Sequence, residues 1–111
     1  MNENLEMIKG DTFSFTIEIE GLTTDLSSCY FSCKKNKADE EYVFKKSLGN
    51  GIEKVETTDN SISYRIKVAP ADTKDIDEGN YFYDLQIEAD GEIFTPLLGV
   101  LVVHEDVTKA V

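Results

Sequence analysis

The stretch Thr12–Glu20, which reads TFSFTIEIE, decides the fold class of this chain. Apolar side chains recur at every second position, with polar side chains between them; the apolar set is Phe13, Phe15, Ile17 and Ile19. A period of two is the period of a β-strand, because successive side chains of a strand point to opposite faces. The stretch therefore predicts a strand with one face on a core and the other in solvent.

The same alternation extends over much of the chain. Ser61–Val68 and Asn80–Glu88 show it clearly, and weaker patterns predict strands at Leu5–Lys9, Ser28–Lys34, Tyr42–Ser47, Ile52–Thr57, Glu92–Leu97 and Gly99–His104. In the last of these, the uninterrupted apolar run Val100–Val103 indicates that both faces of the strand are covered.

Turn signals separate these runs. Asn50-Gly51, Asp59-Asn60 and Asp90-Gly91 are dipeptides that favour the positive φ angles of tight hairpin turns. About seven to nine short strands, with a turn signal about every ten residues, are typical of an all-β antiparallel sandwich. The 111 residues fit one such domain, 1–111, and we expect short flexible tails at 1–4 and 105–111.

One segment, residues 70–79, breaks the alternation. Pro70 suits a first helical position and the acidic residues after it suit a helix N-terminus, so we expect a short helical crossover between the sheets near 70–77. Its acidic residues, Asp72, Asp75, Asp77 and Glu78, partly match an EF-hand loop. The third acidic ligand and the distal glutamate of that loop are missing at the required spacing, which favours capping or solvated acids over calcium.

The sequence from Asp77 to Tyr83 resembles the tyrosine corner of immunoglobulin-like sandwiches. The resemblance implies an immunoglobulin-like fold in which the Tyr81 hydroxyl bonds to the backbone a few residues upstream, in a corner formed with Asp77 and Gly79. Tyr83 occupies the position where antibody domains carry a cysteine. Because the chain has no tryptophan, we expect the core to depend on other aromatic residues, such as Phe13, Phe15, Phe31 and Tyr64.

The charge of the chain restricts its partners. Its 22 acidic and 11 basic residues give a net charge of −11. Such a field repels phosphates, and the longest basic runs, Lys34-Lys35 and Lys45-Lys46, are short, so we expect neither nucleic acid nor membrane as a partner. Residues 1–4 lack the basic and apolar regions of a signal peptide, which predicts synthesis in the cytoplasm.

The residues that could carry catalysis or bind a metal are few. Cys29 and Cys33 share one face of a predicted strand, about 13 Å apart, which is too far for a disulfide and favours two core residues. A zinc site needs more ligands, and His104 is the only histidine. We therefore expect no cofactor, no metal and no enzymatic activity, and an enzyme that uses His104 is the weakest of three hypotheses.

Binding is the remaining function. By alternation Tyr30, Phe82 and Phe94 face away from the main core, either as anchors of an interface or as cover for the second face of the sheet. A carbohydrate-binding module, in which Tyr30, Tyr42 and Phe82 stack on sugar rings, is the alternative to a protein interface.

Taken in order, several motifs resemble small immunoglobulin-like structural proteins of tailed bacteriophages and prophages, above all the N-terminal domain of baseplate upper proteins. The motifs are Lys9–Phe13, Asp25–Ser27, Pro70–Thr73, Gly79–Gln86 and a closing hairpin with Thr95, Gly99 and Asp106–Thr108. The resemblance implies a non-catalytic virion protein of tail or baseplate accessory type, assembling through strand edges and exposed aromatic residues. The resemblance also implies other virion proteins, or further copies of this chain, as partners, in the host cytoplasm first and then in the virion.

Overall fold

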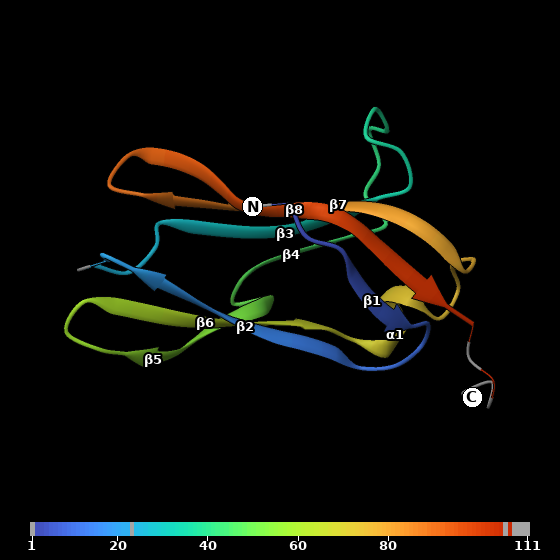
Figure 1. Cartoon of the computed structure of the whole chain (residues 1–111), viewed down its shortest axis with the longest axis horizontal. Helices are drawn as coiled ribbons and strands as arrows, with labels where there is room; N and C mark the ends of the chain where they lie inside the picture. The colour runs from blue at the N-terminus through green and yellow to red at the C-terminus, as the bar shows by residue number, and fades with distance from the viewer. Residues whose placement is uncertain (1, 23, 106, 108–111) are drawn as a thin grey trace.

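Two layers of strands enclose the core of the protein (Figure 1). The computed structural model describes residues 2–22, 24–105 and 107. In chain order its elements are β1 (Leu5–Ile8), β2 (Phe13–Glu20), β3 (Ser28–Lys34), β4 (Phe44–Leu48), β5 (Gly51–Thr57), β6 (Ser61–Val68), α1 (Pro70–Thr73), β7 (Gly79–Ala89) and β8 (Glu92–His104). The expected all-β class is confirmed, with one short helix between β6 and β7.

The strands form one folded sheet in the order β1-β8-β7-β3-β4-β5-β6-β2. One layer holds β1, β8, β7, β3 and β4, and the other holds β5, β6 and β2 (Figure 1). The expectation of a purely antiparallel sandwich is wrong for two pairs, because β1 runs parallel to β8 and β4 runs parallel to β5. After β1 the chain crosses to the other layer, and β1 pairs with β8, which is distant in sequence. After β4 the chain also crosses to the other layer, and β4 and β5 pair only at Ser47–Gly51 and Leu48–Ile52.

The turns explain this topology. Asp90 and Gly91, with φ of 54° and 78°, form the tight hairpin turn between β7 and β8. The Asn50-Gly51 pair does not form a hairpin, because the link carries the chain from β4 in one layer to β5 in the other. Gly51 has a φ of 94°, and a Cβ there would lie 3.0 Å from the Lys67 carbonyl oxygen, so this crossing requires glycine. The Asp59-Asn60 turn joins β5 and β6 without a positive φ.

Three sequence expectations, two about β8 and one about the N-terminal segment beside it, are wrong. The two strands predicted at Glu92–Leu97 and Gly99–His104 are one, because a bulge opposite Leu85–Ile87 accommodates the proline within it. The outer side chains of Val100–Val103 are only half-buried, so the predicted cover on both faces is wrong. Residues 2–4 are not a free tail, since Asn2 pairs with Leu98 and the Glu3 amide donates to the Leu98 carbonyl at 2.8 Å. Residues 1, 106 and 108–111 of the expected tails and closing hairpin lie outside the described residues.

The helical crossover is shorter than predicted, since α1 ends at Thr73. Asp72 caps it: one carboxylate oxygen accepts from the Ala69 amide at 2.7 Å and lies 2.7 Å from the Lys46 ammonium. The buried Thr73 hydroxyl accepts from the Gly10 amide at 2.9 Å, which ties α1 to the turn between β1 and β2. The first acidic residue of this segment therefore accepts from the N-cap amide, as the third residue of a capping box does.

Phe31 lies at the centre of the core. It is fully buried, and its ring centroid lies 5.3 Å from that of Phe15, 5.7 Å from that of Phe44 and 5.6 Å from that of Tyr83. Tyr64 is also buried, and its hydroxyl accepts from the Leu26 amide at 3.0 Å. Of the aromatic residues expected in the core, Phe13 and Phe15 are only half-buried, because they lie on a strand at the edge of the sheet.

The two cysteines are buried free thiols in this core, as the spacing predicts. Burial raises the pKa of Cys29 to about 11 and that of Cys33 to about 12. Desolvation disfavours the thiolate, so both side chains remain neutral thiols at neutral pH.

Candidate functional site

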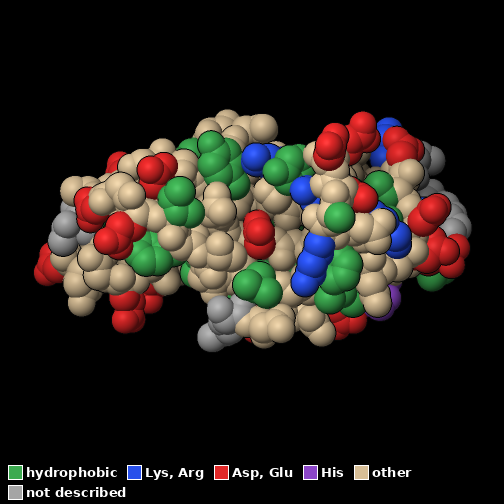
Figure 2. Space-filling model, turned by 90° about the horizontal axis from the view of Figure 1, so that it is seen from above, with side chains coloured by type: hydrophobic (Ala, Val, Ile, Leu, Met, Phe, Trp, Pro, Cys, Tyr) green, Lys and Arg blue, Asp and Glu red, His purple; other side chains and the backbone are tan. Residues whose placement is uncertain are grey.

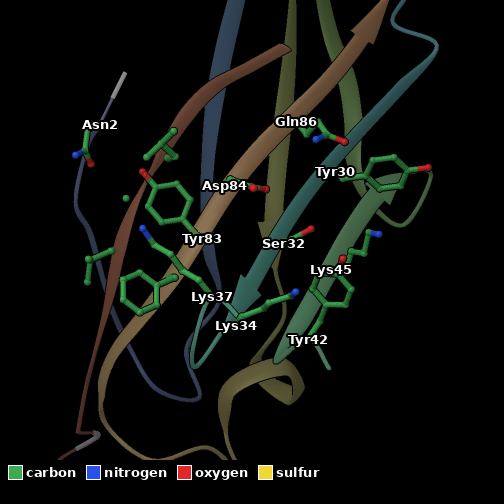
Figure 3. Close-up of a pocket in the computed structure, with 14 residues that line it drawn as sticks. Asn2, Tyr30, Ser32, Lys34, Lys37, Tyr42, Lys45, Tyr83, Asp84 and Gln86 are labelled. Atoms are coloured by element: carbon green, nitrogen blue, oxygen red, sulfur yellow. The ribbon is translucent and has the colours of Figure 1, made fainter. Parts of the chain in front are cut away.

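The outer face of β3, β4, β7 and β8 carries an open groove of about 640 Å³ (Figure 3). We call its lysine and aromatic residues the lysine–aromatic face: Tyr30, Lys34, Lys37, Tyr42, Lys45 and Phe82. Strand alternation accounts for part of this set. Because Cys29, Phe31 and Cys33 point into the core, Tyr30 and Lys34 of the same strand must point outward.

Strand register brings the remaining residues beside them. Lys34 of β3 is paired with Phe82 of β7, and Phe82 is paired in turn with Val100 of β8. On the other side of β3, Ser32 is paired with Lys45 of β4. Lys37 and Tyr42 come from the segment between β3 and β4, which lies over this end of the sheet (Figure 3).

The lysines lie over the aromatic rings. The Lys45 ammonium is 4.7 Å from the ring centroid of Tyr30 and 4.7 Å from that of Tyr42. The Lys34 ammonium lies 4.8 Å from the Tyr42 centroid and also donates to the Asp39 carbonyl at 2.6 Å. Lys37 lies 5.1 Å from the Phe82 centroid. Each cation–π contact contributes about 0.5–1 kcal/mol at an exposed site, so the rings hold the ammonium groups in place.

The local charge of this face is opposite to that of the whole chain. Among the residues that the structure describes, Lys34, Lys37 and Lys45 line the groove with one carboxylate, that of Asp84, although the chain carries −11 overall. Figure 2 views the molecule from above this layer and shows lysines interleaved with hydrophobic side chains on one half, with acidic side chains near the middle, beside the lysines and toward both ends. The groove therefore offers three ammonium groups to a ligand in a chain that is acidic as a whole.

The structure separates the three residues predicted as interface anchors. Tyr30 and Phe82 line the groove, where both are half-buried, and Tyr42 lies with them. Phe94 lies apart, near the β7–β8 turn, with 48% of its surface exposed. Sequence reasoning missed Lys37 and Lys45, because the segment between β3 and β4 brings Lys37 to Phe82 and the register of β4 on β3 brings Lys45 to Tyr30. Alternation along Ser28–Lys34 is enough to predict that Lys34 points outward, on the same face of the strand as Tyr30.

The predicted tyrosine corner is present at the start of β7. The Tyr81 hydroxyl donates to the Asp77 carbonyl at 2.7 Å, and Gly79 between them has a φ of 145°. Desolvation raises the pKa of Tyr81, and the nearby Asp77 carboxylate raises it further. The Tyr83 hydroxyl donates to the Glu3 carbonyl. These bonds fix the entry of the chain into β7 and the position of the N-terminal segment.

His104 lies on the exposed surface, and its Nε2 is 2.9 Å from a carboxylate oxygen of Glu6 on the neighbouring β1. Within residues 2–22, 24–105 and 107, no three His, Cys, Asp or Glu side chains are grouped as metal ligands would be. In the same residues there is no helix of the length and apolarity that a membrane crossing requires.

Solved structures that resemble this chain share little sequence with it, as two of them show. The Ig1 domain of mouse SynCAM 2 is 20% identical, with 96% of this chain and 95% of that chain covered and a TM-score of 0.42. An extracellular domain of the voltage-gated sodium channel beta4 subunit is 13% identical, with 96% and 93% covered and a TM-score of 0.43. No family model matches the chain, and no curated protein matches it in sequence.

Proposed function

We propose that this chain is a non-enzymatic assembly domain of a tailed phage or prophage virion, of tail or baseplate accessory type. In this proposal the lysine–aromatic face binds an acidic surface of another virion protein. The observation that carries the binding role is Lys45, held between Tyr30 and Tyr42 in an open groove of about 640 Å³. The virion setting is supported by the resemblance of the motifs along the chain to phage structural proteins.

The face has the chemistry of a protein interface. Aromatic side chains supply the rigid apolar area on which interface hot spots are built. The lysine stems cover the rings while their ammonium groups reach solvent, so an incoming carboxylate finds charge and apolar surface together. Electrostatic complementarity of this kind mainly accelerates association and weakens as salt is added.

The proposed localisation and partners follow from this role. The chain would be made in the host cytoplasm and then built into the virion. The net charge of −11 argues against a nucleic acid or an anionic membrane as partner, since both carry dense negative charge.

The test uses the proteins encoded beside this gene. Each is co-purified with the wild-type chain, and the affinity of any complex is measured by titration calorimetry at low and high salt. Lys45→Glu is expected to weaken the complex at least about tenfold, because it places a carboxylate opposite an acidic partner. The matched control is Lys54→Glu, on the other layer, where Lys54 pairs with Asp25 on an exposed surface.

Two results would contradict the proposal. Neighbouring genes of purely metabolic function would remove the virion setting, and equal binding by both lysine variants would remove the face. The non-enzymatic part is tested separately: His104→Ala should retain every activity of the wild-type chain.

A carbohydrate-binding module is the second candidate, favoured by Tyr30, Tyr42 and Phe82 in one open groove. A sugar would have to displace Lys45 from the two tyrosine rings before it could stack on them. A glycan array distinguishes the candidates: binding that is lost in Tyr42→Ala would support the module, and no binding to any glycan would remove it.

A further inference from the structure

β2 has an unpaired edge, in the layer opposite the one that carries the lysine–aromatic face. Within the described part of the chain, β2 stands last in the strand order and pairs only with β6. The Gly21 amide donates to the Asn60 carbonyl at 2.6 Å, and hydrogen-bonded pairs alternate along an antiparallel ladder. The backbone groups of odd-numbered β2 residues therefore face β6, and those of Ser14, Thr16 and Glu18 face outward.

The apolar side chains of β2 are less buried than those of its partner β6. β2 and β6 have the same apolar alternation, yet Ile66 and Val68 of β6 are 0% exposed whereas Phe13, Phe15, Ile17 and Ile19 are only half-buried. A groove of about 380 Å³ runs along this edge, between Ile17 and Ile19 on one side and Leu5 and Leu97 on the other. The open side of the sandwich thus exposes backbone hydrogen-bonding groups next to an apolar groove.

The part of β5 beyond its short pairing with β4, and the edge strand β1, carry features that disfavour pairing with another chain. β5 has a bulge between Lys54 and Glu56 and places charged side chains along its exposed length. β1, at the other end of the strand order, is only four residues long. β2 has eight residues in unbroken register with β6, and contains no proline, lysine or bulge. Such an edge is a template for an added strand.

We propose that two copies of this chain associate by antiparallel pairing of their β2 strands about a two-fold axis at Thr16. In this register Phe15 lies beside Ile17 of the second copy, and Phe13 beside its Ile19, so that apolar side chains meet on the inner face. On the outer face Glu18 lies opposite Ser14, and no carboxylate directly faces another. The Glu18 carboxylate already accepts from the Ser61 hydroxyl at 3.1 Å, on the side away from the edge.

The β2 pairing and the lysine–aromatic face respond to salt in opposite directions. Two copies that each carry −11 repel one another, and added salt screens this repulsion, so salt should strengthen the dimer. Binding of an acidic partner to the lysine–aromatic face should weaken under the same conditions. Failure of one proposal is thereby distinguishable from failure of the other.

The experiment is analytical ultracentrifugation of the whole chain up to about 1 mM, at low and high salt. Thr16→Lys and Thr16→Glu each place like charges face to face on the two-fold axis, and each should weaken the dimer about fivefold or more. An equimolar mixture of the two variants places opposite charges there and should restore dimers. Thr57→Lys, the same change at an exposed position on β5, is the matched control and should dimerise like the wild type.

Because Thr16 and Thr57 are exposed, all three variants are expected to fold, and thermal melts check this. A wild-type chain that stays monomeric at about 1 mM in high salt would overturn the proposal. So would an equal loss of dimer in Thr57→Lys and Thr16→Lys. Dimers that persist in both Thr16 variants, or a mixture that does not re-form them, would exclude the register about Thr16.

Discussion

Replacing Tyr81 by Phe tests whether the corner at the start of β7 stabilises the fold. The change removes one hydroxyl, which donates to the Asp77 carbonyl at 2.7 Å. Tyr81 as a residue is 4% exposed and belongs to the core, and the Lys35 ammonium lies 4.6 Å from its ring centroid. Phenylalanine keeps the ring and these contacts, so the substitution isolates a single hydrogen bond.

The expected loss follows from that bond. A net intramolecular hydrogen bond contributes about 1 kcal/mol, and the Asp77 carbonyl can still reach water once its donor is gone. For a chain of 111 residues the unfolding entropy near the midpoint is about 0.23 kcal/mol/K. The melting temperature of Tyr81→Phe should therefore lie about 4 °C below that of the wild type.

Differential scanning calorimetry at neutral pH measures this shift, with Tyr42→Phe, on the exposed loop before β4, as the control. The pKa of Tyr81 is raised in the folded state, so its contribution is present below the unfolded pKa of about 10 and is lost as pH rises through the higher folded value. The difference between wild type and Tyr81→Phe should accordingly shrink at alkaline pH. Equal melting temperatures at neutral pH would refute a stabilising corner.

Three further predictions follow from the core and the N-terminal segment. Gly99→Ala should lower the free energy of unfolding by about 1–3 kcal/mol and accelerate hydrogen exchange at the Glu3 amide, because an added Cβ would lie 2.1 Å from the Glu3 carbonyl oxygen. Unchanged exchange at this amide would argue against the contact. Phe31→Ala should cost about 3–5 kcal/mol in urea unfolding, whereas Phe94→Ala, at 48% exposure, should change stability by less than about 0.5 kcal/mol. Because burial raises the pKa of Cys33 from 9.0 to about 12, the folded state keeps a proton in this pH range that the unfolded state releases. The free energy of unfolding should therefore fall as pH rises from 9.0 to about 12, and it should fall less steeply in a Cys33→Ala variant.

The sequence predicted the local elements well, because alternation depends only on which face of a strand meets the core. Ser28–Lys34 and Ser61–Val68 begin and end at the predicted residues, and the helical crossover starts at Pro70. The hydrogen bond from Tyr81 to Asp77 could also be predicted, because the two residues are close in sequence.

What only the tertiary structure decided concerns which strands are neighbours. Thr12–Glu20 predicts a strand with one face on the core, but not that β2 stands at an edge with its apolar row only half-buried. Lys45 and Tyr30 lie fifteen positions apart, and the register between β3 and β4 brings them into contact. Alternation gives each strand two faces but does not say what lies beside its edges, and both the lysine–aromatic face and the free edge of β2 depend on that placement.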